Sequence, residues 1–190
     1  MDKVQKRSLE SLAFNVVFSV YYFAVGVTSM SWWLLTLGVY YFVLSAARFF
    51  VLKTKKDPLF AERFAGVMLM ILSVPLVAMV VMAVWRDRGN QHHMIVMIAM
   101  AAYAFTKVTL AIVQYFKARR HTSSKLLALR NISLAHALVS IFALQRSMLV
   151  SFEGMNAGEI RVMNGVLGSV VCIAVFLLGL GLYKNKKAEA

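Results

Sequence analysis

The strongest candidate for a functional side chain in this sequence is Lys107, because it lies near the middle of a long apolar segment. A lysine at the centre of a membrane costs roughly 2.5–3.5 kcal/mol on insertion scales, so it normally faces a protein interior, a water-filled cavity or a bound anion. Desolvation also favours its neutral form. The position therefore indicates an anion or polar-solute site, a proton-carrying amine, or a structural lysine capped by carbonyl groups and water.

Three other polar side chains inside apolar segments are candidate partners of Lys107 in a ligand site or pathway. Asn15 and Gln114 carry amide groups that can hydrogen-bond an amine or a solute. His136 lies between Ala135 and Ala137 in another apolar segment. A lone histidine there fits either a protonation switch or a hydrogen-bonded packing residue.

Carboxylates are absent from the predicted apolar segments. All the acidic residues lie outside them or at their edges: Asp2, Glu10, Asp57, Glu62, Asp87, Glu153, Glu159 and Glu189. This pattern disfavours carriers with a buried carboxylate, intramembrane aspartyl proteases and magnesium-dependent phosphotransferases. No P-loop, nucleophile elbow or HExxH motif is present. We therefore predict no catalytic residue and no cofactor, and the pattern favours a role other than that of an enzyme over the alternative of an intramembrane enzyme acting on lipid.

A second group of residues could bind a metal ion through the sulfur atoms of methionine and the nitrogen atoms of histidine. His92 and His93 precede Met94 and Met97, and thioether and imidazole groups suit soft metals such as Cu(I). Met100 continues this spacing of three residues, which drifts around a helix. Methionine is also a common filler of protein cores. Soft-metal transport is therefore a third functional alternative, and these residues are weak metal candidates.

Long apolar segments must position these side chains. The chain has 190 residues, of which 61% are hydrophobic and 15% charged, and its mean hydropathy is +0.71. Its apolar runs are long enough to span a bilayer, which takes about 20 residues each. They cover residues 11–30, 32–52, 65–85, 95–116, 131–150 and 162–183. The sequence therefore predicts an all-α fold: a single membrane domain, polytopic, with a six-transmembrane-helix bundle.

The distribution of Lys and Arg predicts the orientation of this bundle. With six spans, four arginines fall on one side: Arg86, Arg88, Arg146 and Arg161. Fifteen basic residues fall on the other side: Lys3, Lys6, Arg7, Lys53, Lys55, Lys56, Arg63, Lys117, Arg119, Arg120, Lys125, Arg130, Lys184, Lys186 and Lys187. Because cytoplasmic connections are enriched in Lys and Arg, both termini are expected in the cytoplasm, with the protein in the plasma membrane.

The same cations explain the net charge of +13 without nucleic acid. We expect them to contact anionic lipid at the cytoplasmic face, with Arg48 reaching the interface from inside its segment. The candidate lipid contacts are Arg48, Lys53, Lys55, Lys56, Lys117, Arg119, Arg120 and Arg130. At the other interface, Trp32, Trp33 and Trp85 are expected to form an aromatic belt.

The last segment carries small residues suited to close helix packing, Gly165, Ser169 and Cys172. Cys172 is the only cysteine, so no intramolecular disulfide forms, and in an apolar run it should behave as a small hydrophobe.

Two stretches, Arg130–Ser140 with Leu144, Gln145 and Met148 after it, and Tyr103–Lys117, carry a resemblance. The chain resembles a group of small uncharacterised membrane proteins of Clostridium-like Gram-positive bacteria. The resemblance implies a six-helix bundle and no particular activity. It also associates an acidic residue with the position of His136, so an ion pair between that position and Lys107 is not expected in this chain.

The leading functional hypothesis is a small transporter or channel component for an anionic or neutral polar solute, with Lys107 lining the pathway. The alternative is a membrane subunit that docks on another membrane protein. The substrate-binding subunits of energy-coupling-factor vitamin transporters have a similar size and helix count, which is an analogy of architecture only. Homo-oligomers are compatible with either hypothesis.

Overall fold

The described part of the chain forms six long helices. The computed structural model describes residues 3–54, 58–85, 94–117, 124–151 and 156–184. Within them the helices are α1 (Lys3–Thr28), α2 (Trp32–Lys53), α3 (Pro58–Trp85), α4 (Met94–Lys117), α5 (Ser124–Ser151) and α6 (Ala157–Lys184). Each predicted apolar segment coincides with one helix, so the prediction of an all-α chain is confirmed. Four of the helices, α1, α3, α5 and α6, begin five to eight residues before the predicted segment.

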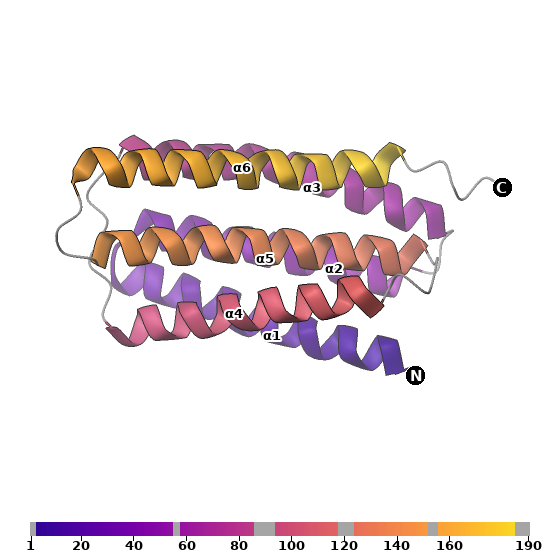
Figure 1. Ribbon diagram of the computed structural model, residues 1–190. Helices are drawn as coiled ribbons and strands as arrows, with labels where there is room; N and C mark the ends of the chain where they lie inside the picture. Colours follow the sequence, from indigo (N-terminus) through magenta and orange to yellow (C-terminus); the bar gives the residue numbers. More distant parts are fainter. Residues whose placement is uncertain (1–2, 55–57, 86–93, 118–123, 152–155, 185–190) are drawn as a thin grey trace.

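The helices run up and down in a single bundle. Figure 1 shows successive helices pointing in opposite directions, so that the start of α1 and the end of α6 lie at the same end, here called the terminal end. The view has three tiers, with α3 and α6 in the first, α2 and α5 in the second, and α1 and α4 in the third. The most extensive packing joins α3 to α6, α1 to α2 and α4 to α5.

Four of the described helices have the length and composition of membrane spans. Four stretches are long and apolar enough to cross a bilayer: Trp32–Lys53, Leu59–Trp85, Lys125–Leu149 and Ala157–Lys184. Helix α1 adds a shorter apolar stretch, Leu12–Thr28. Large apolar side chains such as Val74 on α3 and Val166 on α6 are exposed on the outside of the bundle. An apolar exterior of this kind is expected where lipid, not water, surrounds the helices.

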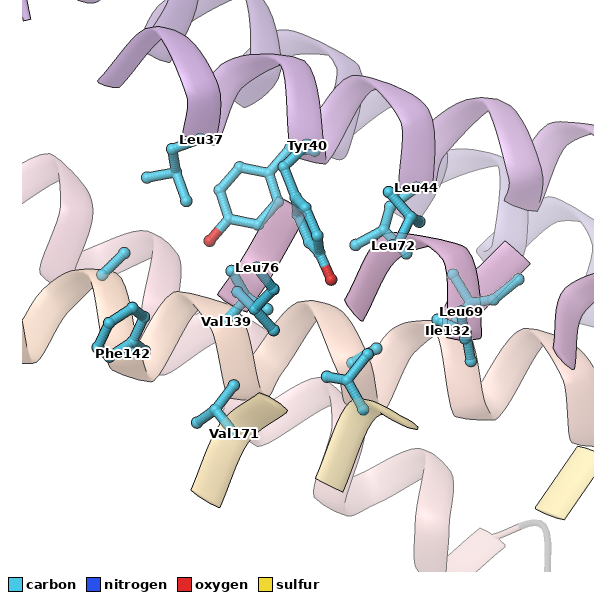
Figure 2. Close-up of a cluster of buried hydrophobic side chains, with 14 of the residues drawn as sticks. Leu37, Tyr40, Leu44, Leu69, Leu72, Leu76, Ile132, Val139, Phe142 and Val171 are labelled. Carbon is cyan, nitrogen blue, oxygen red and sulfur yellow. The ribbon is translucent and has the colours of Figure 1, made fainter. Parts of the chain in front are cut away.

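An apolar core joins α2, α3, α5 and α6. Figure 2 shows side chains from α2 and α3 meeting those of α5 and α6: Leu37, Tyr40, Leu44, Leu69, Leu72, Leu76, Ile132, Val139, Phe142 and Val171. All of these are buried. Leucine, isoleucine and valine fill the middle of this side of the bundle, and the aromatic and polar cluster described next lies on the side of α1 and α4.

Glycines set the closest helix contact in the bundle. A Cβ atom on Gly66 of α3 would lie 2.7 Å from the carbonyl oxygen of Gly179 on α6, and one on Gly179 would lie 2.8 Å from that of Gly66. Cys172 is buried on this helix as predicted. Gly165 is partly buried, and a Cβ atom there would lie 3.5 Å from the side chain of Val84 on α3. The prediction is wrong for Ser169, which is exposed, and Gly168 and Gly179 make closer contacts.

Helix α1 also approaches α2 closely. A Cβ atom on Gly38 would lie 2.9 Å from the backbone nitrogen of Phe23, and one on Gly26 would lie 2.7 Å from that of Leu35. The Oγ of Ser19 donates a hydrogen bond of 2.8 Å to the carbonyl oxygen of Gly38. This contact fixes the rotation of α1, so that its polar face turns into the bundle.

Candidate functional site

A buried polar and aromatic cluster lies where α1, α2, α4 and α5 meet. Its centre is Tyr41 of α2, whose ring stacks on the imidazole of His136 from α5 at 5.3 Å between centroids and an interplanar angle of 12°. The hydroxyl of Tyr41 lies 3.0 Å from the Oγ of Ser140, which donates a 2.7 Å bond to the carbonyl oxygen of His136. Tyr41 is therefore the donor to Ser140, and α2 is joined to α5 by a chain of polar contacts.

Tyr103 joins α4 and α1 to this centre. Its ring contacts Tyr41 at 5.5 Å and Tyr22 at 6.0 Å between centroids, both in edge-on geometry. It also stacks on Phe18 of α1 at 4.2 Å. Three tyrosines from three helices therefore pack ring against ring, and all three are fully buried. Such an assembly holds several hydroxyl groups within an otherwise apolar bundle.

Asn15 is the least satisfied polar residue on α1. Its side chain is 0% exposed, and neither the amide oxygen nor the amide nitrogen has a hydrogen-bond partner among the described residues. It lies one turn before Ser19, which does have a partner on α2. A buried amide without partners costs about 1–3 kcal/mol, so natural bundles rarely retain one without a reason.

The register of α4 places position 107 on the helix face that contains Tyr103. The buried residues of this helix include Tyr103, Ala104 and Ala111. Position 107 is four residues from Tyr103 and four from Ala111, so it shares their face. Gln114 follows on the same helix; the side chains of Lys107 and Gln114 lie outside the described part of the structure.

Arg48 lies inside the bundle, which corrects the prediction that it contacts lipid. Its side chain is 2% exposed, and it lies close enough to Tyr103 for an electrostatic interaction. The reason is its helical phase, since Arg48 follows Leu44 and Ser45 on the buried face of α2. The position of Arg48 in the last turns of its helix was predicted correctly, but the side of the helix from which its side chain projects was not.

Glu62 lies at the edge of the predicted apolar segment 65–85, as expected of the acidic residues, but its side chain is buried, which the sequence did not predict. Helix α3 begins at Pro58, so Glu62 lies within it, near the terminal end, and is 1% exposed. Its neighbours Ala61 and Ala65 are fully buried, so this face of α3 turns inward. A carboxylate and the guanidinium of Arg48 are therefore both buried in the terminal half of the bundle.

The other predicted basic contacts lie near the terminal end or outside the description. Lys53 is exposed, with its Nζ 5.6 Å from the centroid of the Phe49 ring, and Arg130 is partly buried. Lys125 donates a 2.7 Å hydrogen bond to the carbonyl oxygen of Thr54. Outside the description lie Lys55, Lys56, Arg119, Arg120, His92 and His93, together with the side chains of Lys117, Met94 and Met97. Within the described ranges no cluster of His, Cys, Asp or Glu could hold a metal ion.

Two buried residues were misplaced by sequence reasoning. Arg146 was assigned to an external connection and Trp33 to an aromatic belt, yet each is only 7% exposed. The Cζ atom of Arg146 lies 4.1 Å from the centroid of the Trp33 ring. A signal was available, since Arg146 lies in the predicted segment 131–150 and shares the helical phase of Phe142. The other two tryptophans, Trp32 and Trp85, are exposed as a belt requires.

Replacing Tyr41 with phenylalanine should test the link between α2 and α5. The hydroxyl bond to Ser140 is lost, while Ser140 keeps its bond to the carbonyl of His136. We expect stability to fall by about 1 kcal/mol, the usual net value of one hydrogen bond, with the ring stacking retained. Reversible unfolding in detergent measures this. The Tyr21→Phe variant is the control, because Tyr21 is only partly buried, and an equal loss there would contradict the prediction.

Comparison with known proteins gives no match, whether to a protein-family model, to a curated protein or to a solved structure.

Proposed function

We propose that this chain is a six-span plasma-membrane protein with both termini in the cytoplasm, and that it is a small transporter or channel component. In this proposal the cluster between α1, α2, α4 and α5 is the site or pathway of a polar solute, with an anion as the favoured class. Lys107, Asn15 and His136 contact the solute, and the Tyr41–Ser140 pair shapes the site.

The observation that carries the proposal is the fully buried amide of Asn15, which has no hydrogen-bond partner in the described part of the chain. An amide without a hydrogen-bond partner among the described residues has a donor and an acceptor that a solute can use. The neighbouring rings of Phe14 and Phe18 stack with Tyr103, so the same segment of α1 borders the aromatic cluster. A few polar groups in a mostly apolar surround are typical of small-molecule sites.

The basic residues of the cluster favour an anionic solute. Tyr41 and Tyr103 are in ring contact, and α2 and α4 both run toward the terminal end. At 1.5 Å per residue, Arg48 lies roughly 10 Å beyond Tyr41, and position 107 roughly 6 Å beyond Tyr103. The two basic positions therefore lie at similar depth on neighbouring sides of the cluster. Two basic positions at one depth attract negative charge into the site, and the buried carboxylate of Glu62 in the same half of the bundle offsets part of their charge.

The topology is supported by two features of the bundle. Helices α1 and α4 lie alongside the four helices that are long and apolar enough to span, and they extend over a similar length (Figure 1). An up-and-down bundle of six spans brings both termini to one side. The excess of Lys and Arg near that end favours the cytoplasm for it.

Solute flux in proteoliposomes tests the proposal through the Lys107→Met variant. The panel contains small carboxylates, inorganic phosphate, chloride and neutral polar solutes, each with a radioactive or fluorescent readout. We expect wild-type protein to move or bind at least one anion, and Lys107→Met to reduce this about 100-fold, the loss expected when a buried charge contact is removed. The matched control is Lys53→Met, because Lys53 is an exposed lysine at the terminal end.

Two results would contradict the proposal. One is a wild-type protein that is folded and monodisperse yet neither binds nor moves any member of the panel. The other is a Lys107→Met variant that keeps wild-type flux. Equal losses in Lys107→Met and Lys53→Met would also count against a pathway through position 107.

A further inference from the structure

A second cluster of buried polar side chains lies at the end of the bundle opposite the terminal end. It contains Trp33 from the start of α2, Arg146 from the last turns of α5 and Asn164 from α6. The guanidinium of Arg146 covers the face of the Trp33 ring, with 4.1 Å between Cζ and the ring centroid. The ring in turn packs edge-on against Phe142, at 5.7 Å and 74°; Figure 2 shows where Phe142 lies on α5.

The register between α5 and α6 places Asn164 opposite Arg146. The amide nitrogen of Gln145 donates a 3.2 Å bond to the carbonyl oxygen of Met163. Four residues along α6, a Cβ atom on Gly168 would lie 3.1 Å from the Phe142 ring. Because the two helices are antiparallel, one turn beyond Phe142 on α5 faces one turn before Gly168 on α6. These turns carry Arg146 and Asn164.

Three buried polar atoms of this cluster have no hydrogen-bond partner in the described part of the chain. They are the Nε of Arg146, the indole Nε1 of Trp33 and the Oδ1 of Asn164. All three side chains are buried: Trp33 and Arg146 are 7% exposed, and Asn164 is 1% exposed. An arginine side chain is always charged, and buried charges are normally paired. The guanidinium of Arg146 instead packs on the ring of Trp33, which attracts the charge but supplies no hydrogen-bond acceptor for its N–H groups.

We infer that Trp33, Arg146 and Asn164 form a binding site for an oxyanion, either a carboxylate or a phosphate group. The guanidinium lies on the indole face, so its planar edge remains available, and that edge matches carboxylate and phosphate in a two-bond geometry. The indole N–H adds a further donor. The amide of Asn164 lies beside these groups, and rotation about its last bond would exchange the unpartnered Oδ1 for the Nδ2 donor. Phe142 provides an apolar wall for the part of the ligand next to the anionic group.

This site is separate from the one proposed around Lys107 and does not depend on it. Arg146 lies six residues beyond Ser140 on α5, which is roughly 9 Å along the helix axis and away from position 107. The oxyanion can belong to a free solute or to the headgroup of a phospholipid, since both present the same chemistry to an arginine. The experiment below separates these two sources.

Tryptophan fluorescence provides a direct readout, because Trp33 is itself part of the site. The chain has three tryptophans, and the other two, Trp32 and Trp85, are exposed. A Trp32→Phe and Trp85→Phe background in phosphatidylcholine nanodiscs leaves Trp33 as the single reporter. Acetate and inorganic phosphate are titrated at constant ionic strength held with chloride. We expect a saturable change in Trp33 emission with at least one of the two anions.

Variants at two arginines give the matched comparison. Arg146→Gln should raise the half-saturation concentration about tenfold or more, because charge-assisted two-bond contacts are the strong ones. Arg146→Lys keeps the charge in the bundle and should also weaken binding, since lysine lacks the planar fork. Arg161→Gln should have no effect, because Arg161 is exposed at the same end of the bundle. Lys107→Met should also leave the response intact, which separates this inference from the proposed function.

A lipid source of the oxyanion has its own signature. In that case Trp33 emission differs between phosphatidylcholine and phosphatidylglycerol nanodiscs before any anion is added, and Arg146→Gln removes the difference. The inference is overturned if neither anion nor lipid changes the emission of Trp33. It is also overturned if the folded Arg146→Gln and Arg146→Lys variants respond exactly as the background protein does.

Discussion

The Asn15→Leu variant is expected to be more stable than the wild-type protein, by about 1–3 kcal/mol. Leucine has nearly the shape of asparagine, and the buried amide of Asn15 makes no hydrogen bond within the described chain. Its removal therefore ends a desolvation cost and breaks no bond. Unfolding by heat or denaturant in the same detergent measures the difference.

A paired serine on the same helix provides the control. Ser19 is buried one turn from Asn15, and its Oγ donates to the carbonyl oxygen of Gly38. Ser19→Ala should lower stability by about 1 kcal/mol, because it leaves that carbonyl without its side-chain donor. We therefore expect the free energy of unfolding to rise in Asn15→Leu and to fall in Ser19→Ala. A loss of stability in Asn15→Leu similar to that in Ser19→Ala would show that Asn15 supports the fold.

The Gly179→Ala variant is expected to destabilise the bundle by about 1–3 kcal/mol, the usual cost of overpacking. The added Cβ would lie 2.8 Å from the carbonyl oxygen of Gly66 and 3.0 Å from the backbone nitrogen of Met70. Both atoms belong to the backbone of α3, so no side chain can move aside. Helices α3 and α6 must therefore separate along their most extensive contact.

Gly181 is the matched control on the same helix. A Cβ there meets nothing within 4 Å. Gly181→Ala should leave stability unchanged or raise it by up to about 1 kcal/mol, because alanine favours the helix. Measurement of both variants in one detergent gives the comparison. Equal behaviour of Gly179→Ala and Gly181→Ala would contradict the close approach of α3 and α6.

The helices of this fold could be predicted from the sequence, while several of their first turns could not. Apolar length defines a membrane-type helix directly, and all six predicted segments are helical. The missed turns contain polar residues, as in α3, which begins at Pro58. Proline is favourable in the first turn of a helix, where its missing N–H has no partner to lose. Hydropathy alone carries no information about such extensions.

The sequence predicted how far along each helix the buried polar residues lie, but not whether their side chains face the interior of the bundle or its surroundings. Arg48, Trp33 and Arg146 were placed near helix ends, where they do lie, but were assigned to lipid or water. Membrane helices are apolar on every side, so periodicity reveals little about which face turns inward. For the same reason the small-residue face of α6 was assigned to Ser169 rather than to Gly179, which lies on the buried face. Asn15 and His136 were identified because polar residues within apolar runs stand out by type alone.

The central claim is that the polar groups between α1, α2, α4 and α5 serve a solute rather than the fold. The most direct measurement is flux through the Asn15→Leu variant in proteoliposomes, with the anion that the wild-type protein moves best. We expect Asn15→Leu to fold, to be more stable than the wild-type protein, and to show no flux above background. A variant that is equally active, or one that loses activity only because it no longer folds, would contradict it.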